Sequence, residues 1–224
     1  DANNSGLIDL STNTIKTGAR YGLFIATQTS AATIWVTSNT IIPTVTTAND
    51  SYGIYLNGLT SGATIQNNAV VWRNSGSQSG KTAYGLYAQT VTGLNIDHNR
   101  ISHPGLLTAG SLVNAYFAGA SQTQFVYNDV NSTGTAFTNA YLMQLAASTV
   151  TIKSNIFLSS MAVTGSSASL TADTISGFNS DYNDWYSSNS ANTMVWGGQA
   201  YAFASGWSGK DANSIASNPL WFNV

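Results

Sequence analysis

A short motif returns along this chain at nearly constant intervals, and it constrains the fold more than any other feature. Each copy has an apolar residue, two variable residues, an Asn, one variable residue and a second apolar residue, as in Ile65-Gln-Asn-Asn68-Ala-Val70. The Asn positions are Asn13, Asn39, Asn68, Asn99, Asn128 and Asn155, with Asn183 in a degenerate seventh copy, at steps of 26, 29, 31, 29, 27 and 28 residues. A repeat of this length indicates a stack of similar structural units.

A second, aromatic motif accompanies the first. It reads Tyr21-Gly-Leu-Phe24, Tyr52-Gly-Ile-Tyr55 and Tyr84-Gly-Leu-Tyr87, and it persists in worn form as Asn114-Ala-Tyr-Phe117 and Asn139-Ala-Tyr-Leu142. Because two independent motifs recur together, we interpret the repeat as genuine.

The pattern within each unit is that of short β-strands. Apolar and polar residues alternate over three to five positions before a Gly, Asn or Ser, and the chain contains no Glu. A unit of about 28 residues has no room for a crossover helix, so its strands must pair with the same strands of the next unit. The sequence therefore predicts an all-β parallel β-helix, a solenoid of about six to seven coils.

The stacking predicts two columns of side chains. We expect each repeated Asn to occupy the bend between two strands, in the αL or bridge backbone geometry that Asn tolerates. Coils spaced about 4.8 Å apart would let each amide hydrogen-bond to the next. An Asn ladder is predicted through Asn13, Asn39, Asn68, Asn99, Asn128 and Asn155, and an aromatic stack through Phe24, Tyr55, Tyr87 and Phe117.

Charged residues test this alignment of coils. The position after the ladder Asn is Arg100 in one coil and Asp129 in the next. The position two before it is Lys153 in one coil and Asp181 in the next. Stacking predicts that each pair lies face to face.

Composition limits the classes of function. Only 7% of the 224 residues are charged and the net charge is −2, so the chain lacks the basic surface that nucleic-acid binding requires. It has no Cys and no apolar run long enough to span a membrane, so we expect no disulfide, no thiolate metal site and no membrane insertion. A surface of Ser, Thr, Asn, Gln and Gly suits an extracellular or cell-surface protein.

We expect one domain in two parts. Residues 1–178 would form the coils, and residues 179–224 would form an aromatic-rich C-terminal segment that caps the last coil. The aromatic residues of that segment are Trp185, Trp196, Tyr201, Phe203, Trp207, Trp221 and Phe222. A coil pattern that begins within ten residues of Asp1 suggests a processed product or a piece of a longer chain.

The two motifs resemble those of the right-handed parallel β-helix repeat proteins of the pectin-lyase-like superfamily, in which Asn ladders and aromatic stacks occur. The tail resembles a segment that closes β-helix blocks in large, multi-domain bacterial surface proteins. That likeness is carried by Ser180–Asn183, Trp196–Tyr201, Trp207, Gly209–Ile215 and Asn218–Phe222. The resemblance implies a right-handed β-helix and a segment of a large bacterial cell-surface protein.

Residues suited to catalysis are sparse. Polysaccharide lyases and glycosidases of this fold rely on grouped carboxylates, the lyases often with Ca²⁺, and the alignment stacks no two strand Asp residues in adjacent coils before Asp181. Asp97, His98 and Arg100 are the weak candidates for an acid–base site, and a polar coil face is the favoured alternative. Asp181, Asp184 and Asp211 would suit Ca²⁺, although turn-capping is the favoured role.

These observations favour a noncatalytic extracellular solenoid with a structural or adhesive role. Apart from Ca²⁺, no cofactor is expected. The chain would self-associate end to end into filaments, or bind a surface polysaccharide through exposed aromatic residues. The alternative is a polysaccharide lyase or glycosidase on the same fold.

Overall fold

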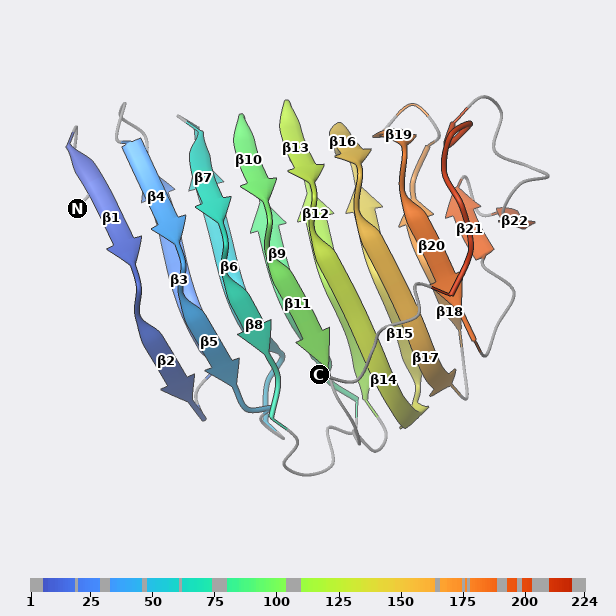
Figure 1. Cartoon of the computed structure of the whole chain (residues 1–224). Coiled ribbons are helices and arrows are strands. Elements are labelled where there is room, and N and C mark those ends of the chain that lie inside the picture. The colour runs from blue at the N-terminus through green and yellow to red at the C-terminus, as the bar shows by residue number, and fades with distance from the viewer. Residues whose placement is uncertain are drawn as a thin grey trace.

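The chain folds into the parallel β-solenoid that the repeat predicts (Figure 1). The structure is a computed structural model that describes residues 6–18, 20–28, 33–45, 48–60, 62–73, 80–103, 110–163, 166–174, 176, 178–188, 193–196, 199–202 and 210–218. Nearly all secondary structure in these residues is β-strand, so the all-β prediction is confirmed. Among them, no helix is long and apolar enough to cross a membrane.

Three sheets run the length of the solenoid, and every coil contributes one strand to each. Sheet A contains β1 (Leu7–Ser11), β4 (Thr33–Thr37), β7 (Ala63–Gln66), β10 (Leu94–Asp97), β13 (Thr123–Val126), β16 (Val150–Lys153) and β19 (Phe178–Asp181). Sheet B contains β2 (Thr14–Thr17), β5 (Thr40–Pro43), β8 (Ala69–Val71), β11 (Arg100–His103), β14 (Asp129–Phe137), β17 (Ile156–Val163) and β20 (Asp184–Ser187).

Sheet C lies behind the other two in Figure 1. It contains β3 (Tyr21–Gln28), β6 (Ser51–Leu59), β9 (Thr82–Gln89), β12 (Ser111–Ala118), β15 (Asn139–Ala146), β18 (Ser167–Ala172), β21 (Thr193–Trp196) and β22 (Gln199–Ala202). All neighbouring strands pair in parallel except β21 and β22, which are antiparallel. Six turns separate β1 from β19.

The interior of the solenoid is a single apolar column. Alternation along each strand turns every second side chain inward, so Val36, Ile65, Ile96, Phe125 and Ile152 stack coil upon coil and are fully buried. The strands are short because each one ends where the chain must turn into the next sheet.

The repeated Asn side chains form a continuous column between sheets A and B. Each Nδ2 donates to Oδ1 of the Asn in the following coil, at 3.0 or 3.1 Å, from Asn13 through to Asn183. That Oδ1 also accepts from the backbone N–H of the preceding Asn, at 2.8–3.0 Å. The column thus provides hydrogen-bond partners for backbone groups at the bend, where strand pairing cannot provide them.

The αL position of the bend lies one residue before the ladder Asn, and not at the Asn itself. The residue before each ladder Asn has the positive φ, with values of 52–58°, and none of the ladder Asn residues does. These αL residues are Thr12, Ser38, Asn67, His98, Tyr127, Ser154 and Tyr182. The bend turns on the preceding residue, and the Asn side chain then points inward to hydrogen-bond.

Residues 210–215 end the column. Asp211 is buried, and its Oδ1 accepts from Asn183 Nδ2 at 3.1 Å, from Trp185 Nε1 at 3.1 Å and from the Ser214 hydroxyl. The Asn183 N–H donates to Ser214 Oγ at 2.8 Å. Asp211 and Ser214 therefore occupy the place that an eighth Asn would take.

The coil pattern extends beyond residue 178, because β19 and β20 pair in register with β16 and β17. Inside this seventh coil the Trp185 ring stacks on Phe157 with centroids 3.8 Å apart. Phe203, Trp207, Trp221 and Phe222 of the expected cap lie outside the described residues.

A glycine column explains the Tyr-Gly motif. Tyr52 and Tyr55 lie three residues apart on one strand, yet both contribute to the same outer face, so the alternation must be interrupted between them. Register pairing skips Gly53, and a Cβ there would lie 2.4 Å from Val70 Cγ1 and 2.5 Å from the Gly85 oxygen. A side chain at Gly53 would therefore require Val70 and the neighbouring coil to move.

Candidate functional site

Seven aromatic rings cover the outer face of four adjacent strands of sheet C. These residues, the tyrosine field, are Tyr21, Phe24, Tyr52, Tyr55, Tyr84, Tyr87 and Tyr116. One column runs through Tyr21, Tyr52 and Tyr84, with centroids 5.2 and 5.1 Å apart. The second runs from Phe24 through Tyr55 and Tyr87 to Tyr116, with separations of 5.1, 4.9 and 4.8 Å.

The aromatic stack departs from the sequence prediction at its last member. Phe117 pairs with Ala88, is fully buried and packs edge-on against Phe125 at 5.9 Å. Tyr116 takes the outer position beside Tyr87. The worn motif is therefore displaced by one residue, and in strand geometry a shift of one moves a side chain to the opposite face.

The rings meet by stacking and, around Tyr87, edge to face, and the hydroxyl groups are the polar part of the field. Tyr55 donates its hydroxyl to Gln89 Oε1 at 2.7 Å. Arg20 lies over the rings of Tyr21 and Tyr52, with its Cζ 5.1 and 5.6 Å from the centroids. Burial raises the pKa of Tyr84 to about 12, so its phenol is neutral at physiological pH.

The candidate acid–base residues do not converge on one point. The buried Asp97 carboxylate hydrogen-bonds His98 Nδ1 at 2.9 Å and accepts from Asn95 Nδ2 at 2.7 Å. Arg100 faces the next coil instead, where its Nε is 4.0 Å from Asp129 Oδ2. The alignment that predicts this pair is confirmed, as is the register of Lys153 with Asp181.

His103 is a second buried titratable group of this region. It is 1% exposed, lies between Trp72 and Phe137, and its ring nitrogens lack hydrogen-bond partners of good geometry. Desolvation lowers its pKa to about 4, opposed by nearby backbone oxygens of His103 and Thr133. Because side chains alternate along a strand, the inward Ile101 could have indicated that His103 also points inward.

The acidic side chains of the seventh coil are engaged by N–H donors. Asp181 accepts from the backbone N–H of Tyr182 and of Asn213, at 3.0 and 2.8 Å, and from Asn213 Nδ2 at 2.9 Å. Asp211 ends the Asn column, and Asp184 accepts from the Ser217 N–H at 3.1 Å. Across the described residues no three His, Asp, Glu or Cys side chains group as metal ligands would.

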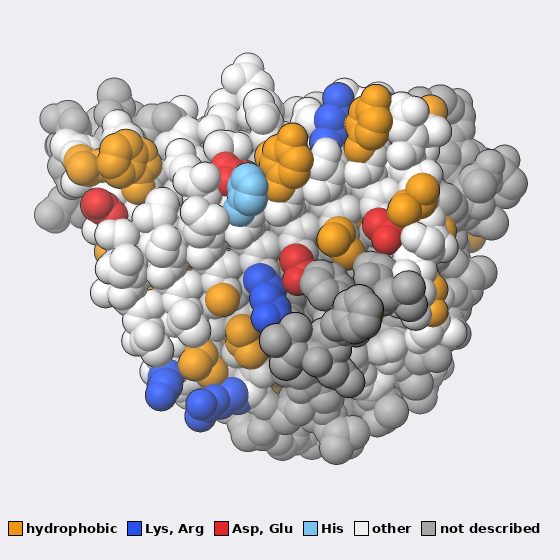
Figure 2. Space-filling model, viewed as in Figure 1, with side chains coloured by type: hydrophobic (Ala, Val, Ile, Leu, Met, Phe, Trp, Pro, Cys, Tyr) orange, Lys and Arg blue, Asp and Glu red, His pale blue; other side chains and the backbone are white. Residues whose placement is uncertain are grey.

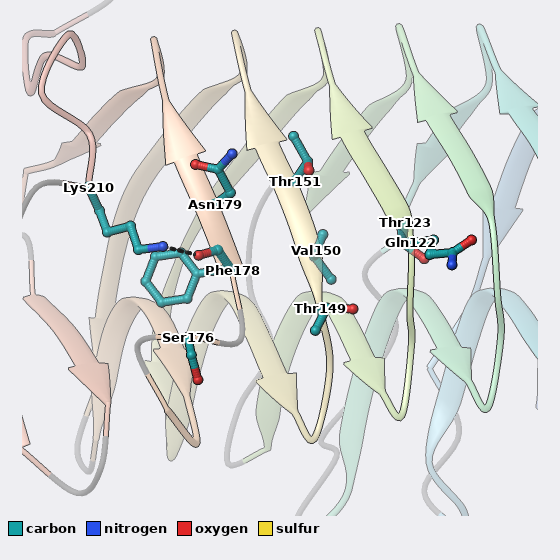
Figure 3. Close-up of a pocket in the computed structure, with 9 residues that line it drawn as sticks. All are labelled: Gln122, Thr123, Thr149, Val150, Thr151, Ser176, Phe178, Asn179 and Lys210. Atoms are coloured by element: carbon teal, nitrogen blue, oxygen red, sulfur yellow. Dashed lines mark hydrogen bonds between the residues drawn. The ribbon is translucent and has the colours of Figure 1, made fainter.

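A shallow groove of about 300 Å³ crosses the last three coils where sheet A begins (Figure 3). Its lining is mainly hydroxyl and amide groups, from Gln122, Thr123, Thr149, Thr151, Ser176 and Asn179. Lys210 spans one end, donating to the Phe178 carbonyl at 2.5 Å with its Nζ over the Phe178 ring. The Lys210 ammonium group is therefore engaged in contacts with Phe178.

The surface formed by sheets A and B is mostly uncharged and polar, with scattered single charges and isolated hydrophobic side chains (Figure 2). Among the described residues, two of the most exposed large hydrophobic side chains are Tyr127, at 59%, and Tyr182, at 60%. The His98 ring stacks on Tyr127 at 5.3 Å.

Scans against protein-family models, curated proteins and solved structures find no match to this chain.

Proposed function

We propose that this chain is a noncatalytic, glycan-binding solenoid segment of a larger extracellular bacterial surface protein, in which it has structural and adhesive roles. The observation that carries the proposal is the tyrosine field, an uncharged array of six phenols and one phenyl ring over four consecutive coils. Aromatic groups with a polar edge suit contact with both the apolar and the hydroxyl-bearing parts of a sugar.

The arrangement of the coils supports the same proposal. Their regular stacking would align repeated binding groups with a repeating polymer, and many weak contacts along one chain give avidity. The resemblance to the pectin-lyase-like superfamily and to bacterial surface proteins agrees with a polysaccharide ligand and a cell-surface location. Asp97, His98 and Arg100 do not meet in one cleft, which favours binding over lyase or glycosidase chemistry.

Tyrosine-to-phenylalanine substitutions test the proposal, because they remove hydroxyl groups and keep the stacked rings. We expect the triple variant Tyr55→Phe, Tyr84→Phe, Tyr87→Phe to lose at least tenfold in affinity for the polysaccharides that the parent chain retains in a sedimentation assay. Tyr127→Phe, away from sheet C, is the matched control. Equal retention of the triple variant and the parent would refute a role for the field.

End-to-end self-association is a second candidate. Ile8, Leu10 and Ile15 of the first coil are only half-buried, whereas their register partners Ile34, Val36 and Ile41 are fully buried. A second copy that covered the first coil would remove this apolar surface from water. Light scattering against concentration tests it, and a monomer at all concentrations would dismiss it.

A further inference from the structure

A hollow of about 290 Å³ lies where the seventh coil meets residues 213–215, on the corner between sheets A and B. Besides the ladder residues Asn155 and Asn183, it is lined by Ser154, Ile156, Tyr182, Asp184, Asn213 and Ile215. The hollow is open and shallow, so it suits a ligand that lies against the surface.

Tyr182 provides an available aromatic face. Its side chain is 60% exposed, and no aromatic ring in the described part of the chain stacks on it. Its backbone is fixed in αL geometry by position in the coil, and its N–H donates to Asp181 Oδ1. Asn213 donates two hydrogen bonds to the Asp181 carboxylate. These bonds order the turn that carries the Tyr182 ring.

The polar groups around this ring are mainly acceptors. Asn213 donates its Nδ2 to Asp181, and its side-chain carbonyl oxygen retains acceptor capacity beside the hollow. The Asp184 carboxylate receives the Ser217 N–H on Oδ1 and retains further acceptor capacity. Ile215, 55% exposed, adds an apolar flank. A matching ligand brings several hydroxyl donors and one apolar face, and carries no negative charge.

We propose that this hollow binds one neutral pyranose unit, with Tyr182 stacked on its C–H face and Asp184 and Asn213 accepting from its hydroxyl groups. A carboxylate-bearing sugar would meet Asp184 and is excluded by repulsion. The site lies on a different part of the coil from the tyrosine field of sheet C, so it stands independently of the function proposed for that field.

The test is titration of the full chain with neutral gluco-, galacto- and manno-oligosaccharides, followed by calorimetry and by ¹⁵N chemical shifts. We expect one of these series to bind, with shifts at Ser154, Tyr182 and Asn213. Tyr182→Ala should weaken binding at least tenfold and Asp184→Asn several-fold. Tyr182→Asn, which suits αL backbone, should weaken it equally and guards against a folding artefact. The matched control Tyr127→Ala, in the same column, should keep the affinity within twofold.

Unchanged affinity in both Tyr182 variants would overturn the site, even if sheet C residues still shift and polysaccharide retention persists. The same conclusion follows if none of the three series binds. Tighter binding of a uronate oligosaccharide than of its neutral counterpart would overturn the assignment of ligand class. Loss of polysaccharide retention in the triple phenylalanine variant alone concerns the tyrosine field and not this hollow.

Discussion

The Asn column makes a quantitative prediction about two chemically identical substitutions. The Asn99 side chain is 3% exposed and takes part in five hydrogen bonds. Its Oδ1 accepts from the N–H and Nδ2 of Asn68, and its two Nδ2–H bonds are shared among three acceptors, Asn128 Oδ1 and the backbone oxygens of Ile65 and Asp97. Asn99→Ala removes all five and leaves the Asn68 N–H buried without a partner.

The expected magnitude follows from those contacts. At about 1 kcal/mol net for each of the four N–H groups involved, with about 1–2 kcal/mol added for the stranded donor, Asn99→Ala should destabilise the fold by roughly 5–6 kcal/mol. Asn13 begins the column, is exposed and donates only two side-chain hydrogen bonds, to Ser11 O and Asn39 Oδ1. Asn13→Ala should therefore cost less than about 1 kcal/mol, because water replaces the lost partners.

Urea unfolding followed by circular dichroism measures both variants against the parent chain. Hydrogen exchange at the Asn68 and Asn128 amides would show whether the damage is local to the adjoining coils. If the two variants differ by less than about 1 kcal/mol, the column contributes through something other than its buried hydrogen bonds, and the reasoning fails.

Three further predictions concern the coil geometry and its interior. Gly53→Ala should destabilise the fold by about 2 kcal/mol or more, because the new methyl overlaps Val70 and backbone, whereas Gly18→Ala, with open space around it, should be near neutral in the same unfolding assay. Ser38→Gly should raise the melting temperature, with a gain of about 1 kcal/mol, since φ is 57° there; a lower melting temperature would contradict this. Desolvation lowers the pKa of His103 from 6.5 to about 4, so between these values the unfolded state binds a proton that the folded state does not. Stability should fall by about 3 kcal/mol as pH drops through that window, and His103→Phe should flatten this part of the pH profile.

The repeat in the sequence was enough to predict the solenoid, because its spacing and its alternation admit few other arrangements. The αL position before each ladder Asn was not predictable in the same way. Its occupants range from Thr12 to Tyr182 and share no side-chain preference, since the coil imposes the geometry and each residue bears the strain.

The extent of the aromatic stack depended on register. Tyr84 precedes Asn99 by 15 residues, and Val113 precedes Asn128 by the same number, so counting from the Asn would have placed Tyr116 beside Tyr87. Counting residues along the sequence could not have located the hollow at Tyr182. It depends on residues 213–215 returning against the seventh coil, and that contact is set by tertiary hydrogen bonds to Asp181 and Asn183.

The Asn column has a direction. From Asn13 to Asn155, each amide donates one N–H to the Asn Oδ1 of the following coil, so the side-chain hydrogen bonds run in one direction along the solenoid, from Asn13 toward Asn183. At that end the Asp211 carboxyl group accepts from the last amide, and it carries no amide N–H that would continue the column. At the other end Asn13 presents its oxygen, which a further coil could satisfy only with a donor. The column of side-chain hydrogen bonds is thus open at Asn13 and closed by Asp211.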